Sequence, residues 1–180
     1  MTRILAIAGS LRAASFNAAL LRAAVAETPE GTTLDIGDMH GVPLYDGDLE
    51  ETEGLPAQVV TLQGQLAAAD GLLLVSPEYN GSIPGVLKNT LDWMSRGKGL
   101  AAFKGKPVAV IGASPGGFGT VLAQAHWAPV MRSLGMRPWH DARLMVSRAG
   151  NVFDADLNLT DGAVRKQLAD YLAGYAASLR

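Results

Sequence analysis

Short runs of apolar residues alternate along the chain with longer segments in which apolar residues recur every three or four positions. A run that is apolar throughout is typical of a strand covered on both faces, as strands in parallel sheets are. Thr33–Ile36 alternates apolar with polar residues and is expected to be an edge strand, and Arg143–Val146 is the weakest candidate for a strand. Three runs are apolar throughout: Ile4–Ala8, Leu72–Val75 and Val108–Ile111.

Helical periodicity fills the segments between these runs. Asn17 is of a residue type that caps helices, and we expect it to cap a helix over residues 18–27, which stops before Pro29. The segment after Gly119 is helical in pattern, but Pro129 cannot donate to the helical ladder and predicts a kink or a break near Ala128. Three further helices are predicted over Val59–Ala69, from Pro84 to Met94, and over Val164–Leu179.

Strands that alternate with helices in this way predict a parallel sheet with right-handed crossovers. Five such units in 180 residues favour one domain over residues 1–180, with three α/β/α layers and a five-stranded sheet. Open sheets of this kind bind ligands beyond the carboxyl ends of their strands. The loops after Ala8, Val75 and Ile111 are therefore the places to search for chemistry.

Composition narrows the possible functions. The net charge of −2 gives no basic surface for nucleic acid, and the absence of cysteine excludes disulfides, thiolate nucleophiles and cysteine-ligated metals. No apolar run approaches the roughly 20 residues of a membrane-spanning helix, and the apolar N-terminus is interpreted as a buried strand rather than a signal peptide. We therefore expect a cytoplasmic protein. The acidic stretch Asp46–Glu53 is expected to be a solvated loop.

The loop after the first strand, Gly9–Asn17, combines two serines and an arginine with a helix N-terminus. Free N–H groups at a helix N-terminus and the helix dipole favour an anion, and Arg12 can add a charge-assisted contact. These residues fit a phosphate group about as well as they fit an ordinary capped helix with a solvated arginine. The glycine-lysine signature of a P-loop is absent, and a single glycine makes the dinucleotide fingerprint weak.

The loop after the third strand, Ser76–Gly85, is stiffened by Pro77 and Pro84 and displays Tyr79 and Asn80. A rigid loop of this kind suits a flat heteroaromatic ring, although a partly buried tyrosine in a plain β–α connection is an alternative. Beside a phosphate-binding loop at the same sheet edge, it predicts a mononucleotide site.

The loop after the fourth strand, Gly112–Gly119, contains the Gly-x-Ser-x-Gly pattern of a hydrolase nucleophile. We reject a hydrolase because Pro115 has no N–H for an oxyanion hole and because no acid lies between Ser114 and the last histidine, His140. We expect a flexible glycine loop that covers one edge of a ring. The three histidines have no metal-ligand spacing, so no metal site is expected.

In the residues of these three loops, the sequence resembles the NAD(P)H-dependent FMN reductases of the flavodoxin-like superfamily. This family includes quinone, azo-dye and chromate reductases. Gly9–Asn17 matches moderately, Pro77–Asn89 with Asp92-Trp93 matches specifically, and Gly105–Val108 leading into Ser114–Gly117 matches weakly. The sequence departs from the family between Pro129 and Arg148.

The resemblance implies a flavodoxin-like sheet of order 2-1-3-4-5 and a tightly but non-covalently bound FMN, with NADPH or NADH as co-substrate. It also implies a homodimer or homotetramer that passes electrons to quinones, azo dyes, chromate or free flavin. The flavin itself performs the chemistry, so no catalytic residue is assigned. The FMN phosphate would be held by Ser10, Arg12, Ser15, Phe16 and Asn17, and the isoalloxazine would be flanked by Pro77, Glu78, Tyr79, Asn80, Gly81, Ser114 and Gly117.

Two rival functions follow from the same fold. A flavodoxin-like electron carrier would bind FMN without turning over NAD(P)H, but such carriers are usually strongly acidic. A regulatory protein that has lost the flavin would be colourless.

Overall fold

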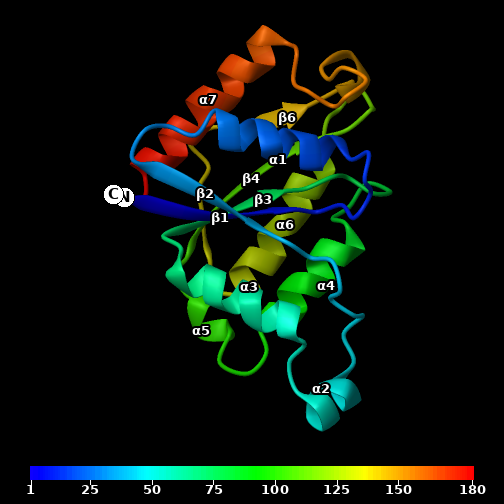
Figure 1. The fold of residues 1–180 in the computed structure, drawn as a ribbon, viewed down its shortest axis with the longest axis vertical. Coiled ribbons are helices and arrows are strands. Elements are labelled where there is room, and N and C mark those ends of the chain that lie inside the picture. Colours follow the sequence, from blue (N-terminus) through cyan, green and yellow to red (C-terminus); the bar gives the residue numbers. More distant parts are fainter.

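The computed structural model describes residues 1–180 and has a parallel β-sheet at its centre (Figure 1). Four full strands run in the order β2-β1-β3-β4, and each is parallel to its neighbour. β3 is buried along its whole length, whereas β2 forms an edge and is partly exposed, as the two sequence patterns predict. The strands are β1 (Thr2–Ala8), β2 (Thr32–Gly37), β3 (Gly71–Val75) and β4 (Pro107–Ala113).

The fifth position of the sheet is shared by two short strands. β5 (Arg137–Pro138) pairs with the start of β4, and β6 (Leu144–Val146) pairs with its end. The chain leaves the sheet between them, over residues 140–143, after the N–H of Trp139 has donated to the carbonyl of Val108 at 2.8 Å. The predicted order 2-1-3-4-5 is therefore confirmed, and the weak strand signal before Val146 marks only the second of the two pieces.

Helices cover both faces of this sheet (Figure 1). α1 (Phe16–Ala26) and α7 (Gly162–Ala177) lie on one face, and α3 (Ala57–Ala68), α4 (Gly85–Met94) and α6 (Val121–Ser133) lie on the other. Each face has its own cluster of buried apolar side chains, so the predicted three layers are present. The sequence pattern did not predict the short helices α5 (Leu100–Phe103) and η1 (Ala149–Asn151). None of the helices combines the length and the apolar character that a bilayer crossing requires.

The residue that caps α1 is Ser15, so the prediction that Asn17 caps this helix is wrong. Ser15 has an extended backbone, and its Oγ accepts a hydrogen bond from the N–H of Ala18 at 3.2 Å. Serine and asparagine are equally good N-cap residues, and sequence alone does not separate them. The Asn17 side chain is instead drawn into the protein, where β4 ends.

α6 is unbroken through Pro129, so the break expected near Ala128 does not occur. A proline inside a helix removes one N–H donor, which here would have bonded to the carbonyl of Ala125. Ala125 and Pro129 both face solvent, so water can satisfy this carbonyl. Trp127 and Met131 are buried on the opposite side and hold both halves of the helix on the sheet.

The acidic stretch expected as a loop forms a short helix, α2 (Gly47–Glu53), which projects from the body of the molecule (Figure 1). Asp46 caps it by accepting a hydrogen bond from the N–H of Asp48 at 2.9 Å. Acidic side chains in a first turn are stabilised by the helix dipole, which explains why a charged segment without buried residues is helical.

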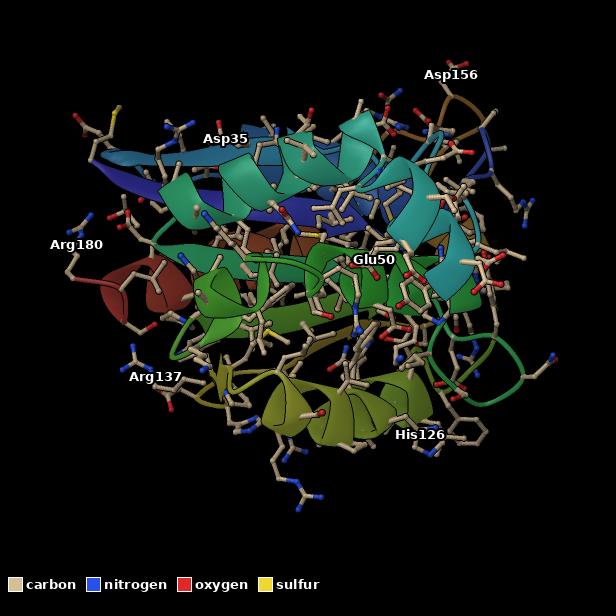
Figure 2. The ribbon with its side chains drawn as sticks, turned by 90° about the horizontal axis from the view of Figure 1, so that it is seen from below. Asp35, Glu50, His126, Arg137, Asp156 and Arg180 are labelled. Atoms are coloured by element: carbon tan, nitrogen blue, oxygen red, sulfur yellow. The ribbon has the colours of Figure 1, made fainter.

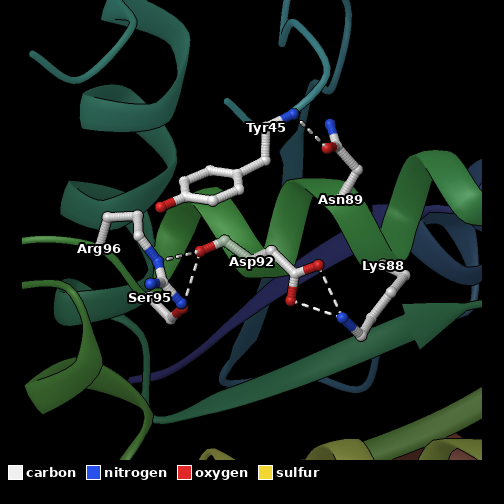
Figure 3. A network of polar contacts seen from close by, with 6 residues as sticks. All are labelled: Tyr45, Lys88, Asn89, Asp92, Ser95 and Arg96. Carbon is white, nitrogen blue, oxygen red and sulfur yellow. Dashed lines mark hydrogen bonds and ion pairs between the residues drawn. The ribbon is translucent and has the colours of Figure 1, made fainter. Parts of the chain in front are cut away.

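The segment that leads to α2 is fastened to α4 (Figure 3). The N–H of Tyr45 donates to Asn89 Oδ1 at 2.8 Å. Asn89 Nδ2 and Trp93 Nε1 both donate to the carbonyl of Pro43, at 2.7 and 3.0 Å. The Tyr45 ring meets the Trp93 ring edge to face. The Arg96 guanidinium lies over the Tyr45 ring, 5.2 Å from the centroid of that ring. Asn89 and Trp93, which belong to the family-like motif, therefore have a structural role here.

Candidate functional site

The loops after β1 and β3 meet at the carboxyl edge of the sheet. The Tyr79 hydroxyl donates to Ser10 Oγ at 3.2 Å, which joins the two loops directly. Gly9 makes this approach possible, because a Cβ there would lie 2.9 Å from Pro77 Cδ and from Leu87 Cδ2. The two loops singled out in the sequence thus form one site.

The loop after β1 gathers unpaired hydrogen-bond donors around the start of α1, an arrangement that we call the anion cradle. In the first turn of α1, Ser15 Oγ caps the N–H of Ala18, while the N–H groups of Phe16 and Asn17 have no partner within the protein. Arg12 is exposed and forms no ion pair. Free N–H donors at a helix N-terminus next to an unpaired guanidinium favour an anion such as a phosphate group.

The loop after β3 is stiffened by a tight turn. Asn80 and Gly81 have φ angles of 51° and 71°, and Tyr79 and Ser82 exchange two backbone hydrogen bonds of 3.0 Å across them. Two consecutive central residues with positive φ make a type I′ turn, for which Asn-Gly is the preferred pair. This turn carries Tyr79, which is 43 % exposed and therefore available to a ligand.

Asn17 clamps the cradle to the central sheet. Its Oδ1 accepts from the N–H of Ala113 at 2.9 Å, and its Nδ2 donates to the carbonyl of Ala113 at 2.8 Å. The side chain is buried, with 4 % exposure. Asn17 therefore satisfies both backbone groups of the last residue of β4 and holds the first turn of α1 against the end of that strand.

The glycine loop after β4 lies beside these residues. The N–H of Ser114 donates to the carbonyl of Val146 at 2.9 Å, and the backbone carbonyl of Ser114 accepts from the N–H of Ala149 at 3.0 Å. The following residues up to Phe118 are exposed, and α6 begins only at Val121. A nucleophile elbow needs a sharp turn from strand to helix, so this geometry agrees with rejecting a hydrolase.

Nine of the twelve predicted site residues line one shallow cavity of about 60 Å³ between the three loops. Asn80, Gly81 and Gly117 lie outside this cavity. Three residues in its wall escaped the sequence analysis, because alanine and proline offer no polar side chain and contribute mainly backbone. The predicted residues in the wall are Ser10, Arg12, Ser15, Phe16, Asn17, Pro77, Glu78, Tyr79 and Ser114, and the missed ones are Ala14, Ala113 and Pro115.

Several titratable groups lie outside this cavity. Burial raises the pKa of Tyr171 and Tyr175 far above the ordinary value, and their hydroxyls donate to backbone carbonyls of the sheet. Burial also lowers the pKa of Lys106. The hydrogen bond that the His40 ring donates to the Asp38 carboxylate raises the pKa of the exposed His40. No three histidine, aspartate or glutamate side chains come together in a way that would hold a metal ion.

Comparison with known proteins places this chain in a family. The sequence pattern of the family described as NADPH-dependent FMN reductase matches residues 2–151. The chain belongs to this family. The match includes β1 to β4 and all three loops that form the site, whereas α7 lies beyond it.

Relatives and solved structures agree with this assignment. The chain is 41 % identical over 170 residues to an NAD(P)H-dependent FMN reductase of Pseudomonas aeruginosa, covering 94 % of this chain and 91 % of the relative. It is 39 % identical over 178 residues to a 2-hydroxy-1,4-benzoquinone reductase of a Burkholderia species, covering 99 % and 96 %. The structure of FerB, a flavoenzyme NAD(P)H:(acceptor) oxidoreductase of Paracoccus denitrificans, superposes with a TM-score of 0.88 at 29 % identity, covering 99 % and 97 %.

Proposed function

We propose that this member of the FMN reductase family is an FMN-dependent oxidoreductase that passes electrons from NAD(P)H to quinones or similar small acceptors. The observation that carries the proposal is the Ser10–Tyr79 contact, because it joins an anion cradle and a rigid aromatic loop into one site. A cofactor with a phosphate at one end and a flat ring at the other needs this combination. The family and the names of its relatives support the same reaction.

The residues present fit FMN. Unpartnered N–H groups at the start of α1 and the free Arg12 guanidinium suit the phosphate, together with the Ser10 and Ser15 hydroxyls. The cavity of about 60 Å³ has room for a phosphate-sized group but not for a whole flavin. We therefore infer that the ring lies on the rim, where Tyr79 and residues 115–118 of the glycine loop face solvent.

The protein's own task in this reaction is binding and orientation. The redox chemistry, which converts NAD(P)H, a proton and a quinone into NAD(P)⁺ and a hydroquinone, belongs to FMN when it is bound. The exposed Tyr79 and the glycine loop would shape the face on which nicotinamide and quinone are received in turn. We assign Asn17 a positioning role, since both groups of its amide are bonded to Ala113.

We further propose that the whole chain is one flavin-binding domain and works in the cytoplasm, where NAD(P)H is available. We also propose that it assembles into a homodimer or homotetramer. The exposed Phe118 and Leu122, 87 % and 49 % accessible next to the site, support a partner subunit near the flavin.

FMN titration and steady-state turnover test the proposal. FMN-free protein should quench flavin fluorescence on binding and should then oxidise NADH or NADPH with benzoquinone as acceptor. Arg12→Ala should weaken FMN binding about tenfold, because a charge-assisted hydrogen bond is worth roughly 1.5 kcal/mol or more. Arg132→Ala, in the last turn of α6, is the matched control and should bind normally.

The outcomes separate the rival functions. A protein that binds FMN but oxidises neither nicotinamide is an electron carrier. A protein that cannot be loaded with FMN is neither a carrier nor a reductase, and the proposal is then wrong.

A further inference from the structure

The N-terminus of α6 is capped by a residue from a different loop. Thr120 occupies the N-cap position, but its side chain makes no capping hydrogen bond. Glu78 Oε2 instead accepts from the N–H groups of Leu122 and Ala123, at 2.8 and 3.0 Å. A carboxylate is well suited to this place, because the free N–H groups and the helix dipole both attract negative charge.

Other contacts join the same loop to α6. Ser82 Oγ and His126 Nδ1 lie within hydrogen-bond distance, at 3.1 Å. Figure 2 shows His126 on α6, toward the end of the sheet opposite to Arg137 and Arg180. A Cβ on Gly81 would touch Leu122 at 3.4 Å, so the turn that follows Glu78 packs against the first turn of the helix.

These contacts connect the two loops that would bracket the flavin ring. The Ser114–Gly119 loop leads directly into α6, so its position depends on where that helix begins. The loop after β3 carries Tyr79, the residue next to Glu78. The hydrogen bonds that Glu78 accepts from α6 therefore tie the loop after β3 to the helix that follows the glycine loop, which links the positions of the two loops.

We propose that Glu78 is a positioning residue, whose carboxylate caps α6 and thereby fixes the gap that receives the isoalloxazine. This inference rests on the proposed function. It gives the Glu78 side chain a role different from the one implied by family resemblance, in which Glu78 lines the ring. Its carboxylate contacts backbone N–H groups of α6, so its effect on a flavin passes through the two loops.

Three substitutions of Glu78 test the proposal, with FMN affinity of the FMN-free protein and the absorption spectrum of the bound flavin as readouts. Glu78→Ala removes the cap, and we expect the Kd for FMN to rise about tenfold. Glu78→Asp keeps the charge but shortens the reach by one methylene, so it should resemble Glu78→Ala. Glu78→Gln keeps the length and an accepting oxygen, so its Kd for FMN should be at least about threefold lower than that of Glu78→Ala.

A matched control separates positioning from general destabilisation. Asp161 caps α7 in the same way, accepting from the N–H of Val164 at 2.9 Å, and α7 packs on the opposite face of the sheet from α6. Asp161→Ala should lower the melting temperature while leaving the Kd for FMN within about twofold of wild type. In FMN-saturated Glu78→Ala, the limiting rate of flavin reduction by NADPH should fall while the KM for NADPH changes little.

Wild-type affinity in all Glu78 variants overturns the positioning role and leaves the proposed function standing. An equal loss of FMN in Asp161→Ala also overturns it, because the effect is then one of stability. If Glu78→Ala does not fold, the comparison of Glu78→Gln with Glu78→Asp decides in the same way. Failure of the wild-type protein to bind FMN overturns the proposed function and this inference together.

Discussion

Replacing Asn17 by alanine tests whether this residue acts as a structural clamp. The substitution removes the hydrogen bonds of 2.9 and 2.8 Å to the N–H and the carbonyl of Ala113. A buried backbone group that loses its partner costs about 1–3 kcal/mol. Asn17 lines the wall of the small cavity, so water can partly replace the lost bonds. We therefore expect the free energy of unfolding to fall by about 2–3 kcal/mol.

Urea unfolding of FMN-free protein measures this loss. With an m-value of about 2 kcal/mol/M, the midpoint should shift by roughly 1–1.5 M while the m-value stays constant. Because no flavin is present, a contact between Asn17 and phosphate cannot contribute to the difference. Asn158→Ala is the control, since Asn158 is exposed and bonds only to exposed Asp154, and it should change stability by less than about 0.5 kcal/mol.

The result that would refute this reasoning is a loss for Asn17→Ala no larger than that of the control. Asn17 would then act only through the ligand, as the family resemblance implies. A loss of stability without FMN, together with weaker FMN binding, would show that the clamp also shapes the cradle.

Three other predictions follow from local geometry. Gly9→Ala places a Cβ 2.9 Å from Pro77 and should destabilise the protein by about 1–3 kcal/mol and weaken FMN binding; unchanged affinity would show that the two loops need not touch. Pro129→Ala restores a helical N–H donor and should raise the melting temperature without affecting FMN, whereas a lower melting temperature would contradict the account of α6. Asp38 raises the pKa of His40, so their pair stabilises the folded state below the unfolded histidine pKa of about 6.5 and loses this effect as pH rises through the folded pKa. His40→Ala should therefore lower the melting temperature more at about pH 5.5 than at about pH 8.5, and equal losses at both pH values would count against the pair.

Local sequence was sufficient for the four full strands of the sheet and for the meeting of the loops that follow β1 and β3. The apolar runs that became β1, β3 and β4 are buried because a strand between two helical layers has no polar face. The Asn80-Gly81 turn likewise depends on the residues at the turn itself. Since carboxyl ends of parallel strands share one edge, the order of motifs along the chain already placed the loops together.

Tertiary structure alone decided what individual side chains do. Asn17 looks like a helix cap in sequence, yet its amide bonds to Ala113, and Glu78 looks like part of a ring-binding motif, yet it caps α6. Pro129 is tolerated because it and Ala125 lie on the exposed side of α6, where water can satisfy the carbonyl that loses its donor. Hydrogen bonds between residues far apart in the chain depend on which backbone groups the fold leaves without partners, and a linear pattern of residue types does not contain that information.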